Sequence, residues 1–194
     1  MRFFGRAVAS VESDADITIP ALRIELLGGL RVRVGGIAVA ESAWRLRKAR
    51  AIVKLLALAD GRRMTQDALL ELLWPEHDPN AAVNNFHRTL YAARSALGDA
   101  GLLRLHQGLL SLGNAASPDT AWIDVEAFTA AATEARRSTD PVRYEQAIAL
   151  YADDLLPEDV YEDWAANSRE ALRRDFLSLL LELARLYENQ SQPD

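Results

Sequence analysis

The sequence lacks cysteine altogether, which excludes disulfide bridges, thiolate metal sites and cysteine nucleophiles. It also lacks any apolar run near the roughly 18 residues that would span a bilayer. Its three histidines, His77, His87 and His106, do not have the spacing of metal ligands. The phosphate-binding motif G-x-x-x-x-G-K-[ST] does not occur. We therefore predict no catalysis, no metal, no cofactor and no membrane contact, and the missing cysteines fit a cytoplasmic location.

Charge is distributed unevenly along the chain. Residues 1–113 carry a net charge of +4 and residues 114–194 a net charge of −10, which together give −6. Basic residues concentrate further in residues 44–63. A basic region favours a polyanion as the partner of the first part of the chain. The acidic second part would repel DNA, so we expect it to contact something else.

Sequence patterning divides the chain into four parts. Residues 1–16 contain acids and no continuous apolar stretch, and we interpret them as a flexible tail. Residues 17–113 form the first predicted domain, and residues 114–121 (NAASPDTA) are small and polar, as in a linker. Residues 122–194 have helical periodicity, and the turn-like residues after their last helix suggest that a longer regulator is truncated there.

The first predicted domain has strands, then three helices, then a hairpin. Alternation of apolar and polar residues predicts an antiparallel meander in residues 22–39. The first helix is expected to end with Gly61 as its C-cap, and the second to begin at the N-cap Thr65. The third is expected between Asp78-Pro79 and Gly98. Residues 102–112 then form a hairpin, and this order of elements is that of a winged helix.

The third helix carries the candidate recognition surface. Its apolar stripe is Val83, Phe86, Leu90, Ala93 and Leu97. The helix before it is expected to bury Leu69, Leu72 and Leu73. The face opposite the stripe has amide, hydroxyl and arginine side chains and no acid, which suits a major groove, because arginine forks onto guanine and asparagine pairs with adenine. The candidates for reading bases are Asn84, Arg88, Tyr91 and Ser95.

Other basic and polar residues are candidates for the DNA backbone. Several cluster at the start of the first helix, where backbone N–H groups also favour anions, and others lie at the hairpin tip. The set is Arg45, Arg47, Lys48, Arg50, Arg62, Arg63, Asn85, His87, Arg94, Arg104, His106 and Gln107. The alternatives are a merely solvated helix face, or a protein–protein interaction or signalling adaptor module built on the same elements.

The second predicted domain is all-helical. Asp124 and Asp140-Pro141 are expected to cap its first two helices, which bury Phe128 and Tyr144 among others. A long last helix carries Leu172, Phe176, Leu179, Leu180, Leu183 and Tyr187 as its apolar set. Paired helices suggest a TPR-like hairpin, although no clean 34-residue repeat is present.

Two stretches resemble a known family. Residues 44–99 resemble the OmpR-type winged helix of SARP-type regulators, through the run LWPEHDPNAAVNNFHRTLYAARSAL (73–97). Residues 122–137 and 147–174 resemble the bacterial transcriptional activation domain that follows it, through the run LLPEDVYEDW (155–164). The resemblance covers nearly everything from about Leu22 onward. It implies an α+β fold, a winged helix followed by TPR-like helices.

The resemblance also implies a function. It implies a sequence-specific activator of transcription that binds double-stranded DNA at repeated sites, as a homodimer there, and that contacts RNA polymerase. It places the recognition helix in residues 78–97 and the wing at His106-Gln107. The polymerase-contact loop would comprise Trp74, Glu76, His77 and Asp78. Many members have an arginine where this chain has Ala92, so Arg88 and Arg94 are expected to contribute more.

Overall fold

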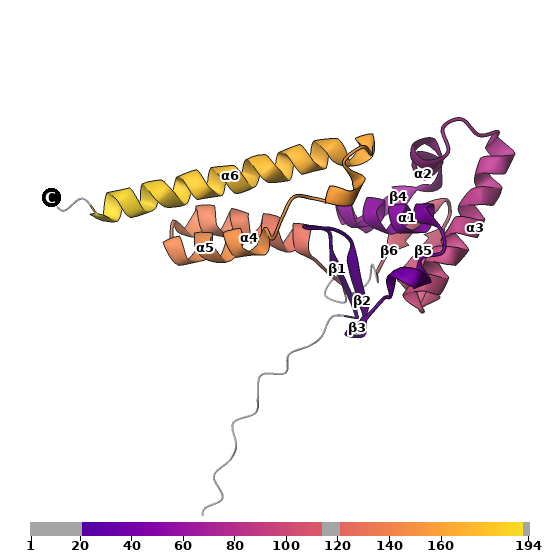
Figure 1. The fold of residues 1–194 in the computed structure, drawn as a ribbon, viewed down its shortest axis with the longest axis horizontal. Coiled ribbons are helices and arrows are strands. Elements are labelled where there is room, and N and C mark those ends of the chain that lie inside the picture. The colour runs from indigo at the N-terminus through magenta and orange to yellow at the C-terminus, as the bar shows by residue number, and fades with distance from the viewer. Residues whose placement is uncertain (1–20, 114–120, 192–194) are drawn as a thin grey trace, which may run out of the picture.

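A computed structural model describes residues 21–113 and 121–191 as a mixed α+β fold. Figure 1 shows helices α1–α3 at one end and helices α4–α6 at the other, with strands β1–β3 below their junction. We call residues 21–113 the N-terminal part and residues 121–191 the C-terminal part. None of the described helices is long and apolar enough to cross a membrane.

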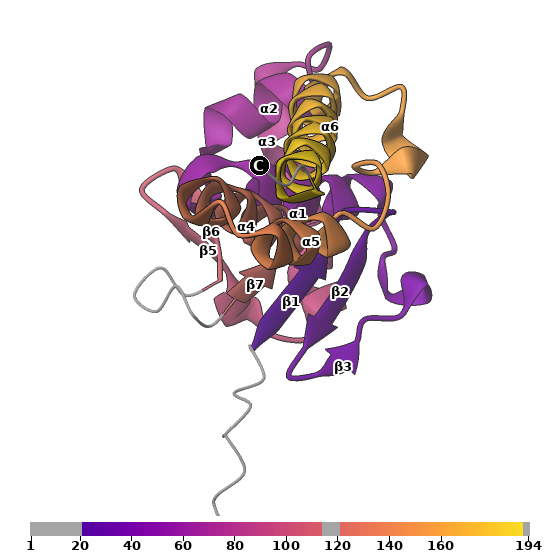
Figure 2. The same ribbon diagram turned by 90° about the vertical axis from the view of Figure 1, so that its left-hand side faces the viewer.

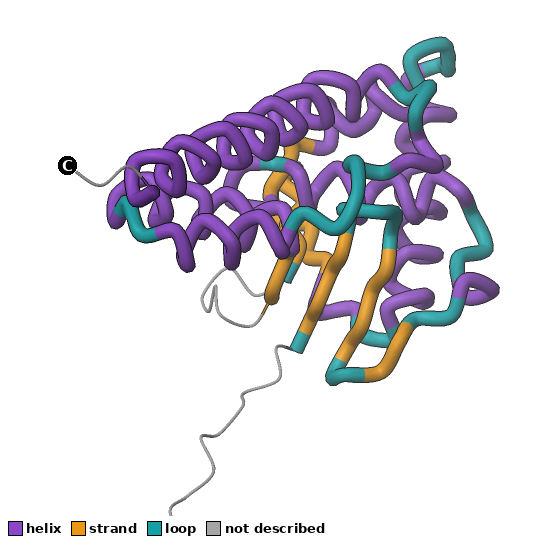
Figure 3. Tube along the Cα trace, turned by 60° about the vertical axis from the view of Figure 1, so that its left-hand side comes forward, coloured by secondary structure: helices purple, strands orange, loops and turns teal. Residues whose placement is uncertain are grey.

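The first sheet contains the predicted meander and one strand that the sequence pattern missed. Strands β1 (Leu22–Glu25), β2 (Arg31–Val34) and β3 (Ile37–Ala38) are antiparallel, which confirms the prediction. Strand β7 (Ala121–Ile123) pairs in parallel with the free edge of β1, so the order is β3-β2-β1-β7 (Figure 3). Residues predicted to end a linker and begin a helical domain therefore complete the N-terminal sheet.

Helices α1 (Arg47–Leu58), α2 (Gln66–Leu73) and α3 (Pro79–Leu97) follow, mostly as predicted. The Thr65 hydroxyl accepts a hydrogen bond from the Ala68 N–H and so caps α2. Two expectations were wrong. The C-cap of α1 is Ala59, and Gly61 lies two residues later, inside a 3₁₀ helix (Asp60–Arg62). Leu72 is exposed because the short α2 buries only Leu69 and Leu73.

A second sheet carries the predicted hairpin. Strands β5 (Leu103–His106) and β6 (Leu109–Leu112) are antiparallel, with Gln107 and Gly108 at positive φ in the tight turn. Strand β4 (Arg63–Thr65), which the sequence pattern did not predict, pairs with β6 and gives the order β4-β6-β5. The hairpin is therefore anchored beside the start of α2.

The C-terminal part comprises α4 (Asp124–Ser138), α5 (Pro141–Leu150) and α6 (Asp163–Ser191), and Figure 2 views these helices nearly end-on. Asp140 caps α5 as predicted, by accepting a hydrogen bond from the Val142 N–H. Phe128 and Tyr144 are buried, also as predicted. Leu180 is 38% exposed and Tyr187 43% exposed, contrary to expectation, although the Tyr187 hydroxyl donates to the Glu145 carboxylate of α5 at 2.6 Å.

One hydrophobic core runs through both parts of the molecule. Asp124 does not cap α4 across a turn as predicted; instead its buried carboxylate accepts hydrogen bonds from the Leu26 and Leu27 N–H groups, at 2.8 and 2.9 Å. Burial raises the pKa of Asp124, against the opposing effect of these bonds. Leu27 also bridges to Leu155. The end of β1 is therefore held by residues about a hundred positions away in the sequence.

The turn between β1 and β2 fits closely against the C-terminal part. The Gly28 N–H donates to the Asp154 carbonyl oxygen at 3.0 Å. Gly28 has a φ of +82°, and an added Cβ would lie 3.3 Å from the Cβ of Asp153. Glycine suits this position because it tolerates positive φ and leaves room for the neighbouring loop.

Candidate nucleic-acid interface

Helix α3 presents a polar face that the rest of the fold leaves open. Its start is fixed by Asp78, which accepts hydrogen bonds from the Asn80 and Ala81 N–H groups, and its end by Gly98 in the left-handed conformation. Phe86 and the other predicted stripe residues pack inward, with Val83 only partly buried. On the opposite side all four candidates for reading bases are exposed: Asn84, Arg88, Tyr91 and Ser95.

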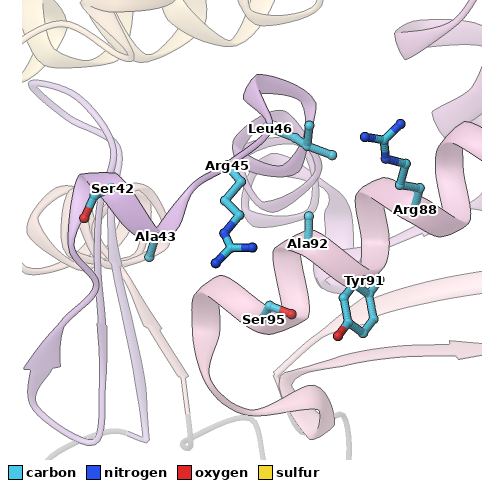
Figure 4. A pocket seen from close by; sticks show the side chains of 8 residues that line it. All are labelled: Ser42, Ala43, Arg45, Leu46, Arg88, Tyr91, Ala92 and Ser95. Carbon is cyan, nitrogen blue, oxygen red and sulfur yellow. The ribbon is translucent and has the colours of Figure 1, made fainter.

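A groove of about 630 Å³ runs between this face and the segment before α1. Its walls are the side chains of Ser42, Ala43, Arg45, Leu46, Arg88, Tyr91, Ala92 and Ser95. Figure 4 shows Arg45 extending across the groove toward the Ser95 end of α3, while Tyr91 points outward and is 74% exposed. Ala92 is half-buried in the groove wall, beside Arg45.

Arg88 also borders a smaller depression on the other side of Leu46. This depression, about 220 Å³, includes Lys48, Trp74 and Asn85 in its lining. The Lys48 ammonium donates to the Leu73 carbonyl oxygen and lies 4.7 Å from the centre of the buried Trp74 ring. Burial lowers the pKa of Lys48. Lys48 thus joins α1 to the end of α2.

Several arginines that were predicted to contact the DNA backbone pair instead with acidic side chains of this chain. Arg47 pairs with Glu162, and Arg50 donates to Glu41 at 2.9 Å and lies 4.0 Å from Glu158. Arg62 forms a two-pronged pair with Glu126, with N···O distances of 2.8 and 2.6 Å, and its side chain is only 17% exposed. These arginines connect the N-terminal part to acids, most of them in the C-terminal part.

Lys54 is the cation that the sequence pattern missed. It is 3% exposed, and its ammonium pairs with Glu158 at 2.9 Å and with Asp159. Both acids belong to the short 3₁₀ helix (Pro157–Asp159) that lies against α1. The one sequence signal for this role is that Lys54 stands among apolar residues of α1 such as Val53 and Leu55.

A smaller set of the cations predicted to contact DNA has no acidic partner in the described ranges. In the described ranges, Arg45, Arg63 and Arg88 form no salt bridge. Arg94 is half-buried and donates to the Leu103 carbonyl oxygen at 2.9 Å, which ties α3 to the hairpin. Arg104 donates to the Gly101 carbonyl oxygen and stays exposed.

The remaining predicted residues lie at the edges of this surface. His87, His106 and Gln107 are exposed, the last two at the hairpin tip, and Asn85 is half-buried. In the loop between α2 and α3, Glu76, His77 and Asp78 are exposed, but Trp74 is buried. No cluster of three or more metal-ligating side chains occurs among the described residues.

Comparison with known proteins identifies the fold. No protein-family model and no curated protein matches the sequence. Among solved structures, the chain is similar to EmbR of Mycobacterium tuberculosis, determined in complex with a low-affinity phosphopeptide. The TM-score is 0.65 and the identity 24%, over 82% of this chain and 43% of the EmbR chain. The chain thus spans less than half the length of EmbR, and within that span it has an EmbR-like fold.

Proposed function

We propose that the protein is a cytoplasmic, non-enzymatic regulator of transcription of the SARP type, which reads DNA with α3. The observation that carries this proposal is the acid-free outer face of α3, bordered by two arginines that have no acidic partner in the described structure, Arg45 and Arg88. Phosphate would be repelled by acids at such a surface and attracted by arginines. The likeness to EmbR, a SARP-family regulator, supports the same class of function.

Within this proposal the residues divide by role. Asn84, Arg88, Tyr91 and Ser95 face the bases, while Arg45 and the hairpin tip with His106 and Gln107 contact phosphates. Activation, binding at repeated sites as a homodimer, and a polymerase contact through Glu76, His77 and Asp78 rest on the sequence resemblance. Buried Trp74 is left out of that contact set.

The test begins with selection of binding sites from random double-stranded DNA by the full chain. On the selected site, Arg88→Ala should weaken binding by about 1–3 kcal/mol and relax the preference at one base pair. Arg45→Ala should weaken all sequences about equally and reduce the log–log salt slope by about 0.9.

The control variant is Arg62→Gln, which removes a cation whose charge is already paired with Glu126. It should leave DNA affinity and the salt slope unchanged. If Arg88→Ala and Arg45→Ala bind as tightly as the parent at matched salt, the assignment of the α3 face is wrong. Absence of any salt-dependent DNA binding by the parent would instead favour the interaction-module alternative.

A further inference from the structure

The smaller depression between the start of α1 and the middle of α3 is rich in hydrogen-bond donors. Its volume is about 220 Å³, and the described residues that line it are Leu46, Arg47, Lys48, Trp74, Asn85, Arg88 and Thr89. Three of these residues are cations, two more have neutral polar side chains, and none is an acid. Figure 4 shows the Arg88 side chain on the side of Leu46 away from Arg45, so Leu46 separates the depression from the larger groove.

Thr89 is the residue of this depression that the sequence pattern missed. It is 4% exposed, yet it lines the depression, and its hydroxyl forms no hydrogen bond in the described structure. A buried hydroxyl without a partner is costly, because it has lost its bonds to water. The Thr129 and Thr133 hydroxyls of α4, in contrast, donate to the carbonyl oxygen four residues earlier. An unused buried donor that lines a depression indicates a ligand that accepts from it.

The start of α1 makes the same place favourable for negative charge. Leu46 is the N-cap residue, so in the described structure no side chain accepts from the first N–H groups of the helix. These N–H groups and the helix dipole favour an anion. The Lys48 ammonium uses one of its three donors on the Leu73 carbonyl oxygen, which leaves donors for a ligand. Burial lowers the pKa of Lys48, so its charge is not fully compensated within the chain.

These features together select a phosphate group as the ligand. A phosphate group carries negative charge and has several acceptor oxygens, so it accepts charge-assisted hydrogen bonds from donors on different sides. A neutral ligand would leave the cations of the depression uncompensated, and a metal cation would be repelled by them. The depression also lies beside Arg88, at the edge of the α3 face that we propose reads bases.

We propose that this depression binds one phosphate group, with the Thr89 hydroxyl and the Lys48 ammonium as donors at the start of α1. A phosphate of double-stranded DNA and a free phosphate ion share this chemistry. For the DNA phosphate the inference rests on the proposed function, since the DNA has to lie along α3. The site thereby gains a buried residue, Thr89, that the set of expected backbone contacts did not contain.

Binding of the selected DNA site by the full chain, followed by fluorescence anisotropy at several salt concentrations, tests the first source. Thr89→Val removes the hydroxyl and keeps the shape of the side chain, and it should not destabilise the fold, because that hydroxyl has no partner inside the chain. It should weaken binding about tenfold for all sequences alike. The salt slope should stay unchanged, since the hydroxyl is neutral.

Lys48→Met should also weaken binding to all sequences, but with a log–log salt slope reduced by about 0.9, because it removes a charge. The matched control is Thr133→Val, which removes an exposed hydroxyl of α4 whose bond lies within its own helix. It should change neither the DNA affinity nor the salt slope. Thermal unfolding followed by circular dichroism verifies that each variant is folded.

Calorimetric titration with inorganic phosphate, against chloride at matched ionic strength, tests the second source. Loss of DNA affinity in Thr89→Val assigns the site to the DNA backbone. Binding of phosphate ion by the parent but not by Thr89→Val, with equal DNA affinities, assigns it to a free phosphate. A Thr89→Val variant that equals the parent in both titrations overturns the proposal. A parent that binds no DNA refutes the DNA-reading proposal, and the phosphate titration then decides the depression on its own.

Discussion

The N-terminal part uses its cations in two different ways. On the side of α1 that meets the C-terminal part, Arg47, Arg50 and Lys54 are paired with acids of the loop around Glu158. On the side that meets α3, Arg45 and Arg88 border an open groove without an acidic partner in the described structure. Cations that stand within a few residues of one another in the sequence therefore differ in whether an acid of the same chain pairs with them.

Because some of the cations are paired inside the chain, the net charges of the two parts overstate the basic charge that is open to a partner. The +4 of residues 1–113 and the −10 of residues 114–194 suggested a basic part for DNA and an acidic part for another partner. In the folded chain, part of the acidic charge pairs with part of the basic charge across the junction. What remains for a polyanion is the smaller set of arginines that faces the groove, Arg45 and Arg88.

The largest effect should come from removing the C-terminal part altogether. A chain that ends at Gly113 loses β7 and Asp124, which leaves the edge of β1 unpaired and the Leu26 and Leu27 N–H groups without their acceptor. It also exposes apolar side chains of the shared core. We expect this fragment to lose the cooperative thermal transition of the full chain, as followed by circular dichroism. A cooperative transition within a few degrees of the parent would show instead that the predicted winged-helix domain folds independently.

An intermediate effect should follow from removing a cation that pairs with acids of the C-terminal part, while leaving Arg45 and Arg88 at the groove unchanged. Lys54→Met leaves Glu158 and Asp159 without their cation at a largely buried site and should lower the free energy of unfolding by about 3 kcal/mol. The matched change at a groove arginine, Arg45→Met, should alter the free energy of unfolding by less than about 0.5 kcal/mol. Urea unfolding of both variants measures the difference. Equal losses of unfolding free energy in the two variants would contradict the distinction between acid-paired and groove-facing cations.

The smallest effect concerns pH at the same junction. Burial acts to raise the pKa of Glu158, but hydrogen bonds from Lys54 and the Leu30 N–H outweigh it, so the pKa is lowered from 4.5. A lowered pKa in the folded state stabilises the fold above about pH 4.5, and this stability is lost as the pH falls through the folded value. Asp124 acts in the opposite direction, because its pKa is raised and its folded form binds a proton more tightly.

The variant Glu158→Gln isolates this contribution. Its free energy of unfolding should fall less than that of the parent between about pH 6 and pH 3.5. Urea titrations at the two pH values provide the measurement, with Glu134→Gln as the control, since Glu134 pairs with Arg143 on an exposed surface within the C-terminal part. The same loss in parent and Glu158→Gln would mean that the Lys54 pairing does not couple folding to pH.

Much of the helical structure could be predicted from the sequence. Asp78-Pro79 and Gly98 set the bounds of α3, and the apolar spacing around Phe86 set its buried side. The outward direction of Arg88, Tyr91 and the other base-reading candidates follows from the same periodicity. What those residues contact stays a prediction. Leu180 of α6 shows the limit, because apolar spacing alone does not say how far around the helix the packing of neighbouring helices extends.

The sequence by itself determined features whose causes lie within about four residues: the caps of α2, α3 and α5, the tight hairpin turn and the buried side of α3. Only the tertiary structure decided that β7 pairs with β1, that Asp124 accepts hydrogen bonds from Leu26 and Leu27, and that Lys54 pairs with Glu158. In each of these contacts the two partners are about a hundred residues apart in the sequence. A cap or a turn needs only neighbouring backbone groups. A strand edge or a buried charge can be satisfied by any distant segment that the fold brings near, and no local pattern specifies which one.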